Sequence, residues 1–455
     1  MTELSTSDID RSVEEIMTFH ASFHSFFRFK TRDVIKPSLQ YQQGLLLGDK
    51  RKNMTNMEKT VPDCDHQSLQ NFISDSKWDE EGVICEIQRR VCELIGNPVH
   101  GSIHLDESGF LKDGKSSVGV KRQYCGRFGK VDNCQVGVFL GYAFWSYRTL
   151  IDKRLYLPEE WANDPDRREL CSVPEEITFK TKAEWGWEML LNARKGNLPF
   201  GWVGMDCFYG QQPWFLDKLD GGNFLYIADI PIDTRVWLER PKVEVPKRKG
   251  DRGRHPTRKQ LVEGEPKPIE ARKIAEELLD GTWDHIFLRD TERKELWCDM
   301  ACLRVHQVRD GLPGPESWLI IRKDDNGEMK YQLSNASPNA TKNRLAEMSC
   351  SRYWIERAFE DGKGEVGMAD YEVRGWTGWH HHMTMVLLAM LFLLILQLKW
   401  KDKAPMLTIQ DVREMLEVIL PKRSITKRDI LDIIKEKHKT RESARRSHHK
   451  KNSKA

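Results

Sequence analysis

Two aspartates end short apolar segments of the sequence and could hold a cation between them. Asp106 ends the segment Ser102-Ile-His-Leu-Asp106, and Asp206 ends the segment Gly201-Trp-Val-Gly-Met-Asp206. Open sheets place their sites at strand ends, and two carboxylates that meet there repel each other unless a cation lies between them. Hard oxygen ligands of this kind suit Mg²⁺ or Mn²⁺. Taken singly, an aspartate that ends a strand is more often a turn or helix-cap residue.

A third carboxylate, Glu356, is predicted to lie on a helix between two cations. On a helix spanning Ser349–Lys363, the residues Arg352, Glu356 and Lys363 are separated by four and seven positions, so they share one face, on which Ser349 also falls. A helix salt bridge between Arg352 and Glu356, worth about 0.2–0.5 kcal/mol, would explain the pair without any catalytic role. The helix therefore indicates a catalytic site only in combination with the two aspartates.

Positive charge is concentrated in two segments, although the formal net charge of the chain is only +3. Lys242–Lys259 carries eight Lys or Arg against two acidic residues, and residues 399–455 carry seventeen against eight. Clustered positive charge attracts phosphate backbones through counterion release, so both segments are candidate nucleic-acid contacts. A solvated linker and a solubilising tail are the alternative interpretation. In the first segment the candidates are Lys247, Arg248, Lys249, Arg252 and Arg254.

The elements that must position these residues follow a recognisable order. Residues 101–230 predict three strands in an antiparallel meander, followed by a helix, a strand ending at Asp206, a second helix and another strand. The last two strands are expected to be parallel. This order is that of a ribonuclease-H-like α/β fold, whose mixed sheet is flanked by helices. A helical region (1–100) precedes this core. Between Asp206 and Glu356 the core is interrupted by a β-containing insertion (231–315), and the core resumes over 316–400. A basic helical tail (401–455) follows.

Composition favours an intracellular globular protein. The 455 residues include ten cysteines with no CxxC pair, so we expect neither disulfides nor a structural zinc site, and the three consecutive residues His380–His382 would point in different directions on a helix. The N-terminus is polar and acidic, unlike a secretory signal. The apolar run Met383–Leu398 is sixteen residues long and is predicted to be a buried core helix rather than a membrane anchor, because spanning takes about 20 residues. We therefore expect a cytoplasmic protein without a membrane partner.

The sequence resembles the DDE transposases of bacterial insertion sequences, in the branch with the signature Tyr-x2-Arg-x3-Glu-x6-Lys. Arg352, Glu356 and Lys363 match its last three positions, whereas Ser349 stands at the Tyr position. The resemblance covers roughly residues 40–420 and includes the segments Leu105–Phe110, Ser117–Gly126, Val131–Val138, Tyr331–Ala336 and Gly375–His380. The substitution puts in doubt a contact with DNA that the family's Tyr makes at the element end, and the neighbouring Tyr353 could substitute.

The resemblance implies cut-and-paste transposition by two-metal-ion phosphodiester cleavage and strand transfer. Asp106, Asp206 and Glu356 would hold two Mg²⁺ or Mn²⁺ ions. Glu107 is a rival for the first position, but strand alternation and the family pattern favour Asp106. Arg352 and Lys363 would bind phosphates near the cleaved bond. The helical region 1–100 and the basic loop of the insertion would contact element-end DNA. A homodimer would bring two ends together.

Two alternatives stay open at this point. A catalytically inactive DNA-binding protein derived from a transposase would keep the basic surfaces, and Ser349 is the feature in its favour. A nuclease of the same fold would cut DNA without joining strands. Terminal inverted repeats and target DNA are the expected partners of the transposase.

Overall fold

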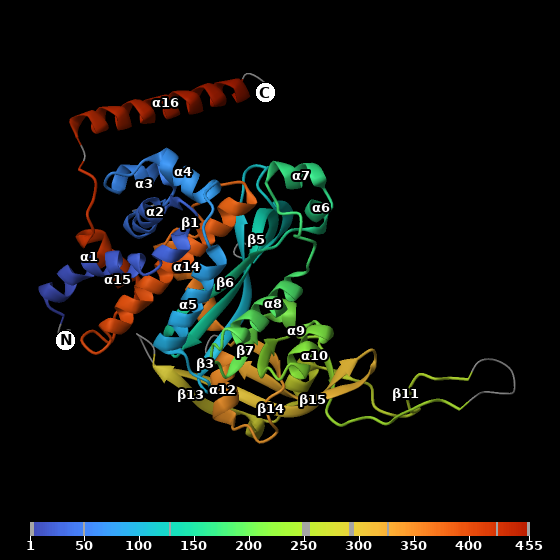
Figure 1. Ribbon diagram of the computed structural model, residues 1–455. Helices are drawn as coiled ribbons and strands as arrows, with labels where there is room; N and C mark the ends of the chain where they lie inside the picture. Colours follow the sequence, from blue (N-terminus) through green and yellow to red (C-terminus); the bar gives the residue numbers. More distant parts are fainter. Residues whose placement is uncertain are drawn as a thin grey trace.

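The computed structural model describes residues 4–48, 51–126, 129–247, 255–290, 295–324, 327–424 and 426–452. In Figure 1 the N-terminal helices lie beside the long helix α14 (Trp376–Lys399), and the sheet runs past both. Four of the predicted DNA-binding residues, Arg248, Lys249, Arg252 and Arg254, lie outside the described residues.

A mixed sheet forms the centre of the molecule and confirms the predicted ribonuclease-H-like arrangement of strands and helices. β3 (Gly101–Leu111) pairs in parallel with β7 (Trp202–Met205), and β7 pairs in parallel with β8 (Tyr226–Asp229). The short crossover between β7 and β8 contains α9 (Cys207–Gly210) and α10 (Pro213–Gly221). The parallel pairing follows from this helical crossover, as predicted.

On its other side β3 pairs antiparallel with β5 (Lys130–Phe144), and β5 pairs with β4 (Lys121–Cys125) and β6 (Tyr147–Leu155). The predicted meander order is wrong here, because β5 and not β4 is the neighbour of β3. The sequence predicts three strands here, whereas the structure has four. The missing signal is the turn between β5 and β6, where Trp145 adopts a positive φ of 54°. Two-residue hairpin turns with this conformation usually carry Gly or Asn, so the sequence predicts no turn at Trp145.

The strands of the resumed core and of the predicted insertion continue the same sheet. β16 (Met329–Ser334) pairs antiparallel with β8, and the register sets Gln332 opposite Asp229. β15 (Leu312–Lys323) pairs with β16 as the predicted hairpin, and β14 (Glu295–Arg309) pairs with β15. The sheet ends in β9 (Arg235–Trp237), β12 (Ile269–Glu270) and β13 (Asp284–Asp290), while α11 (Ala271–Glu277) and the 3-10 turn Asp280–Thr282 lie between β12 and β13.

A separate two-stranded ribbon carries the basic loop of the insertion. It consists of β10 (Val243–Glu244) and β11 (Gln260–Leu261), paired antiparallel. Figure 1 shows this ribbon extending away from the body of the molecule. Lys247, just beyond β10, is exposed.

The N-terminal region is helical, as predicted, and packs on α14. Its amphipathic helices bury Phe, Ile, Leu and Val side chains in the same apolar core as the strands β3 and β5. α14 is apolar on every side; it is long and apolar enough to span a membrane, but 83% of its most apolar stretch is buried inside the protein. The helices of this region are α1 (Thr6–Ala21), α2 (Ile35–Leu47), α3 (Met54–Thr60), α4 (His66–Ser74) and α5 (Glu80–Ile95), with a short 3-10 turn (His24–Phe27) and the strands β1 (Arg28–Phe29) and β2 (Arg32–Asp33).

The helix predicted over Ser349–Lys363 is two helices, which corrects the prediction that Ser349 shares a face with Glu356. α12 (Lys342–Cys350) ends before α13 (Tyr353–Glu365) begins. The hydroxyl of Ser351 donates to the carbonyl oxygen of Met348 at 2.7 Å and accepts from the indole nitrogen of Trp202 at 2.9 Å. A serine hydroxyl that bonds a preceding carbonyl competes with the helical pattern, so the chain breaks here.

The remaining helices complete the outer layers. α16 stands apart from the body in Figure 1. All ten cysteines are free thiols. These helices are α6 (Glu159–Ala162), α7 (Pro165–Leu170), α8 (Lys182–Lys195), α15 (Ile409–Ile419) and α16 (Lys427–Asn452).

Candidate active site

Asp106 and Asp206 occupy equivalent places, each directly after the last residue of the parallel pairing between β3 and β7. Leu105 of β3 lies opposite Met205 of β7 in the parallel register, so the two aspartates are the next residues on neighbouring strands. Asp106 lies within the long strand β3 and is 13% exposed at its side chain. The backbone amide of Glu107 donates to Oδ1 of Asp106 at 2.7 Å.

Asp206 caps the short helix that follows its strand. Its Oδ1 accepts from the backbone amides of Phe208 at 3.0 Å and Tyr209 at 3.4 Å. This helix-cap role, which the sequence offered as the alternative to a metal site, uses only one oxygen. Among the described residues, hydrogen bonds reach only Oδ1 of Asp206, so Oδ2 keeps its lone pairs for another partner.

A third aspartate, Asp229, ends the next parallel strand and is absent from the sequence prediction. Met205 of β7 lies opposite Ala228 of β8, which places Asp229 beside Asp206. The rule that selects the other two aspartates, an acidic residue after an apolar strand, also applies to Tyr226-Ile-Ala-Asp229. The predicted strand ends one residue early, at Ala228, and so leaves the aspartate outside the sheet.

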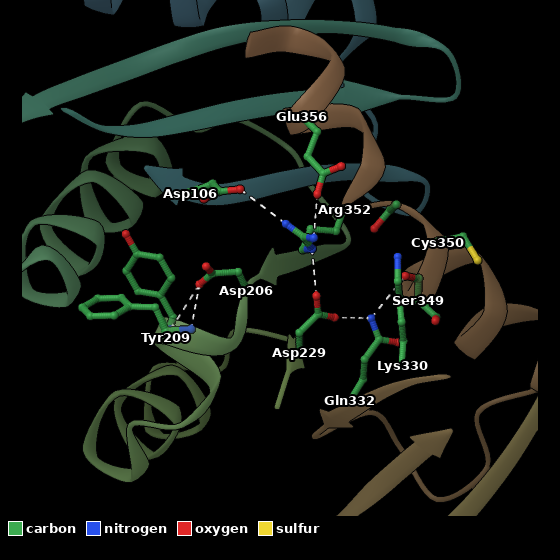
Figure 2. A network of polar contacts seen from close by, with 12 residues as sticks. Asp106, Asp206, Tyr209, Asp229, Lys330, Gln332, Ser349, Cys350, Arg352 and Glu356 are labelled. Carbon is green, nitrogen blue, oxygen red and sulfur yellow. Dashed lines mark hydrogen bonds and ion pairs between the residues drawn. The ribbon is translucent and has the colours of Figure 1, made fainter. Parts of the chain in front are cut away.

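Arg352 lies at the centre of these carboxylates (Figure 2). Its Nε is 2.8 Å from Oδ2 of Asp229, its Nη1 is 3.4 Å from Oδ2 of Asp106, and its Nη2 is 2.6 Å from Oε1 of Glu356. The break between α12 and α13 positions it, because Arg352 is the capping residue of α13. The helix salt bridge to Glu356, which the spacing allowed as an explanation without a catalytic role, is present, and it is one of three carboxylate contacts of this side chain.

The pKa values of the aspartates reflect their crowding. Burial and the neighbouring charge of Asp206 raise the pKa of Asp106 to about 8, against a lowering effect of Arg352. Burial and the charge of Glu107 raise the pKa of Asp206 to about 6. Burial lowers the pKa of Arg352, but the charges of Asp229, Asp106 and Glu356 outweigh it and raise that pKa above its ordinary value. One arginine therefore leaves negative charge in the site uncompensated.

Glu356 is the most accessible of the site's carboxylates. It lies in the first turn of α13, and its side chain is 49% exposed. Lys363 lies in the last turn of the same helix, where its Nζ is 5.6 Å from the ring centre of Phe359 and 5.9 Å from that of Phe110 on β3. The structure thus gathers Asp106, Asp206, Glu356 and Arg352 in one place and puts Lys363 about two turns away along α13.

Glu107 forms a salt bridge with a lysine on the other face of β3. Its Oε1 lies 2.5 Å from Nζ of Lys182 on α8, and the hydroxyl of Tyr209 donates to its Oε2 at 3.4 Å. Strand alternation sends this side chain away from Arg352. Glu107 is thus paired with Lys182, whereas Asp106 shares Arg352 with Asp229 and Glu356.

Ser349 is buried beneath the site. It is 2% exposed, its Oγ accepts from Nη1 of Arg322 at 3.0 Å, and its carbonyl oxygen accepts from the same nitrogen at 2.8 Å. Tyr353, by contrast, is 43% exposed and lies under the guanidinium of Arg289, 5.1 Å from the ring centre. Of these two positions, only Tyr353 presents an aromatic side chain to the surface.

A cleft of about 370 Å³ opens beside Arg352 and Glu356. Its lining residues lie on or next to the strands β8, β13, β14, β15 and β16 and the helices α12 and α13. Four of them are cationic and three, Asp229, Asp324 and Glu356, are acidic, so the lining has a small excess of positive charge. The cationic residues are Arg289, Arg322, Lys330 and Arg352.

The acidic residues fit a divalent cation by donor chemistry. Carboxylate oxygens are the ligands that Mg²⁺ and Mn²⁺ prefer. Burial first, and neighbouring carboxylates second, raise the pKa values of Asp106 and Asp206, and a nearby cation would offset both effects. Within the described residues, no three acidic, His or Cys side chains are arranged as a ready cation cage. Arg352 lies between the carboxylates instead.

Comparisons with known proteins bear on the family of this chain. Residues 22–295 match the family model described as DDE superfamily endonuclease. A curated relative from Microchaete diplosiphon, named "Probable transposase for insertion sequence element IS701", is 24% identical over 333 residues, which cover 71% of this chain and 73% of the relative. The family match includes Asp106, Asp206 and Asp229 but ends before Glu356, so the assignment of Glu356 rests on its place in the structure and on the signature spacing.

Proposed function

The chain belongs to the DDE superfamily of endonucleases, in which it is a transposase of the insertion-sequence type, and we propose that it cuts DNA at the ends of its element and joins those ends to target DNA. The supporting observation is the convergence of Asp106, Asp206 and Glu356 around Arg352, next to a cationic cleft. The substrates are the element's terminal inverted repeats and a target duplex.

We propose that Asp106, Asp206 and Glu356 hold two Mg²⁺ or Mn²⁺ ions. When bound, such a pair activates the attacking oxygen and stabilises the leaving oxygen of an in-line displacement at phosphorus. The protein's part is to fix the ligands. The backbone amides of Phe208 and Tyr209 orient Asp206 through one oxygen, and the strand β3 holds Asp106 beside it. Glu356 approaches from α13, where its partial exposure leaves it open to DNA.

The cations around the site bind the DNA backbone in this proposal. Arg352 presents a planar guanidinium that suits two phosphate oxygens, and Lys363 reaches a phosphate farther along the strand. Arg289, Arg322 and Lys330 add positive charge to the cleft beside Glu356, where Asp324 pairs with the last two of them. The same site cuts first with water and joins next with the released 3′-hydroxyl, because both steps are displacements at phosphorus by an oxygen nucleophile.

The rest of the chain recognises DNA outside the site. The helical N-terminal region binds the terminal repeats, and the ribbon β10–β11, with Lys247 at the start of its basic loop, contacts end DNA. The basic tail, with α16, adds nonspecific affinity for phosphates. A homodimer, acting in the cytoplasm, brings two ends together.

The experiment is cleavage and joining of labelled DNA that carries the element's ends. The wild-type protein is incubated with a target plasmid, with Mg²⁺ or with a chelator, and both end cleavage and joined products are scored. Mg²⁺-dependent products of both kinds support the proposal. Cleavage without joining identifies a nuclease, and binding without either product identifies an inactive DNA-binding descendant of a transposase.

A further inference from the structure

We infer that Asp229 is a positioning residue that holds Arg352 by its Nε and leaves the two terminal nitrogens of the guanidinium to grip a DNA phosphate. The inference rests on the proposed function, because it takes DNA as the ligand of Arg352. It assigns a role to a fourth carboxylate at the site, and that role is distinct from cation binding.

The first support is the division of the guanidinium among its partners. Asp229 contacts Nε at 2.8 Å, whereas Nη1 faces Asp106 at 3.4 Å and Nη2 faces Glu356 at 2.6 Å. Nε lies at the base of the planar guanidinium, so one carboxylate there fixes the plane without covering its outer edge. The nitrogens of that outer edge form the fork that binds phosphate oxygens in pairs.

The second support is the saturation of Asp229. Its Oδ2 takes Arg352, and its Oδ1 accepts from Nε2 of Gln332 at 2.6 Å. Asp206 differs, because hydrogen bonds among the described residues reach only its Oδ1. Both oxygens of Asp106 are contacted too, but its contact with Arg352 is longer, at 3.4 Å. Asp229 is therefore held more tightly by protein side chains than either of the other two aspartates.

The third support is the set of hydrogen bonds that connects Asp229 with Gln332 and Ser349 (Figure 2). Gln332 is 2% exposed, lies opposite Asp229 in the β8–β16 register, and also donates to the carbonyl oxygen of Ser349 at 3.3 Å. Arg322, which is buried too, donates to that same carbonyl at 2.8 Å. A hydrogen-bonded chain therefore runs from β15 and β16 through Asp229 to Arg352, and buried chains of this kind hold their members in one geometry.

This arrangement gives Arg352 two settings about one anchor. Its outer nitrogens contact Asp106 and Glu356 in the structure. Cations held by those carboxylates would compensate their charge and would leave the outer nitrogens to the DNA, while Nε would stay on Asp229. An arginine that is already oriented loses less conformational entropy on binding phosphate than a free one.

The test is a double-mutant cycle on DNA binding in the full-length protein. Asp229→Asn, Arg352→Ala and the double variant are compared for equilibrium binding of end DNA with Ca²⁺ present in place of Mg²⁺. Positioning predicts that Asp229→Asn weakens binding by roughly tenfold, although it removes a negative charge, and that the double variant binds no worse than Arg352→Ala. Additive losses, or tighter binding by Asp229→Asn, would overturn the inference.

Cation affinity separates positioning from ligation. Mn²⁺ is titrated into the DNA-free proteins and followed by the paramagnetic resonance signal of free Mn²⁺. Asp229→Asn should keep the affinity of the wild type within about twofold, whereas Asp206→Asn should lose it. If Asp229→Asn and Asp206→Asn lose Mn²⁺ alike, Asp229 is a ligand and the inference fails.

A second variant covers the case in which Asp229→Asn does not fold. Gln332→Leu removes the donor to Oδ1 of Asp229 without touching Arg352, and it should weaken end-DNA binding in the same direction while leaving Mn²⁺ affinity unchanged. Unchanged DNA binding by this variant counts against the inference. The double-mutant cycle measures binding and needs no cleavage. A wild type that binds DNA but does not cut it refutes the proposed function, and the cycle still tests the role of Asp229.

Discussion

Asp206 lies close enough to Asp106 for its charge to raise the pKa of Asp106, which burial and this repulsion together bring to about 8. The two residues follow a registered pair in neighbouring parallel strands, Leu105 opposite Met205. The sheet thus forces together two groups that repel each other. Such an arrangement destabilises the cation-free protein, and it is typical of sites whose geometry serves function at the expense of stability.

Asp106→Asn should stabilise the cation-free protein at alkaline pH. A carboxyl whose folded pKa is raised binds more protons folded than unfolded, so its contribution to the free energy of unfolding falls as pH rises from about 4 to about 8. We expect the variant's melting temperature in EDTA to exceed that of the wild type by about 1–3 °C at pH 8, with the difference vanishing towards pH 4. Exposed Asp233 provides the matched control, Asp233→Asn. A variant that melts below the wild type at pH 8 contradicts the assignment.

The buried histidines of α14 should make the protein acid-sensitive. Burial lowers the pKa values of His380, His381 and His382 to about 3, 4 and 3, so these residues are neutral in the folded protein. A histidine with a lowered folded pKa stabilises fully above its ordinary pKa of about 6.5, and the stabilisation is lost as pH falls below that value. When denaturant unfolding is measured between pH 7 and 4.5, the free energy of unfolding of His382→Gln should change less with pH than that of the wild type. An equal slope would mean that His382 is not buried as a neutral group.

Ser349→Tyr should lower stability and should not improve DNA binding. Ser349 is buried against Arg322, so a tyrosine there must displace the hydrogen bonds of Arg322 and overpack the interior, at a cost of about 1–3 kcal/mol. Thermal melting and end-DNA binding test this expectation, with Ser349→Ala as the milder comparison. Stronger DNA binding by a stable Ser349→Tyr protein would show that the position faces DNA.

Tyr353→Ala should weaken binding of end DNA by roughly tenfold, because an exposed aromatic ring next to the cleft offers a surface on which a base can stack. Tyr353→Phe keeps the ring and should bind nearly as the wild type does. Equal losses by both variants would indicate that the hydroxyl, rather than the ring, makes the contact.

Lys247→Ala should reduce the salt dependence of DNA binding. A lysine that neutralises one phosphate contributes about 0.9 to the slope of log K against log salt, so its removal makes the slope shallower by about that amount. Binding isotherms between roughly 50 and 200 mM salt measure this slope, and Lys195→Ala, on the exposed end of α8, is the control. An unchanged slope would remove the ribbon from the DNA interface.

The central sheet was predictable from the sequence because its signals are local. The apolar strands before Asp106 and Asp206, the short crossover before β8 and the hairpin of β15 and β16 all have patterns that depend on a few neighbouring residues. The turn at Trp145 was not predictable, since its positive φ is imposed by the pairing of β5 with β6 and not by a turn residue.

The site was predictable as a set of residue types but not as a geometry. The spacing of Arg352 and Glu356 predicted their salt bridge. It could not show the helix break at Ser351, which depends on Trp202, a residue far away in the sequence. Nor could it show that Arg352 contacts Asp229, because that contact arises from the parallel pairing of β7 with β8 and the packing of α13 over the strand ends.

The most direct test of the central claim is Mg²⁺-dependent cleavage of labelled element-end DNA by the wild type and by Glu356→Gln, with binding measured on the same preparations. We predict that the wild type cuts and joins the ends, whereas the variant binds them with similar affinity and forms no product above about one thousandth of the wild-type rate. A variant that cuts as the wild type does would show that Glu356 is not part of the catalytic centre.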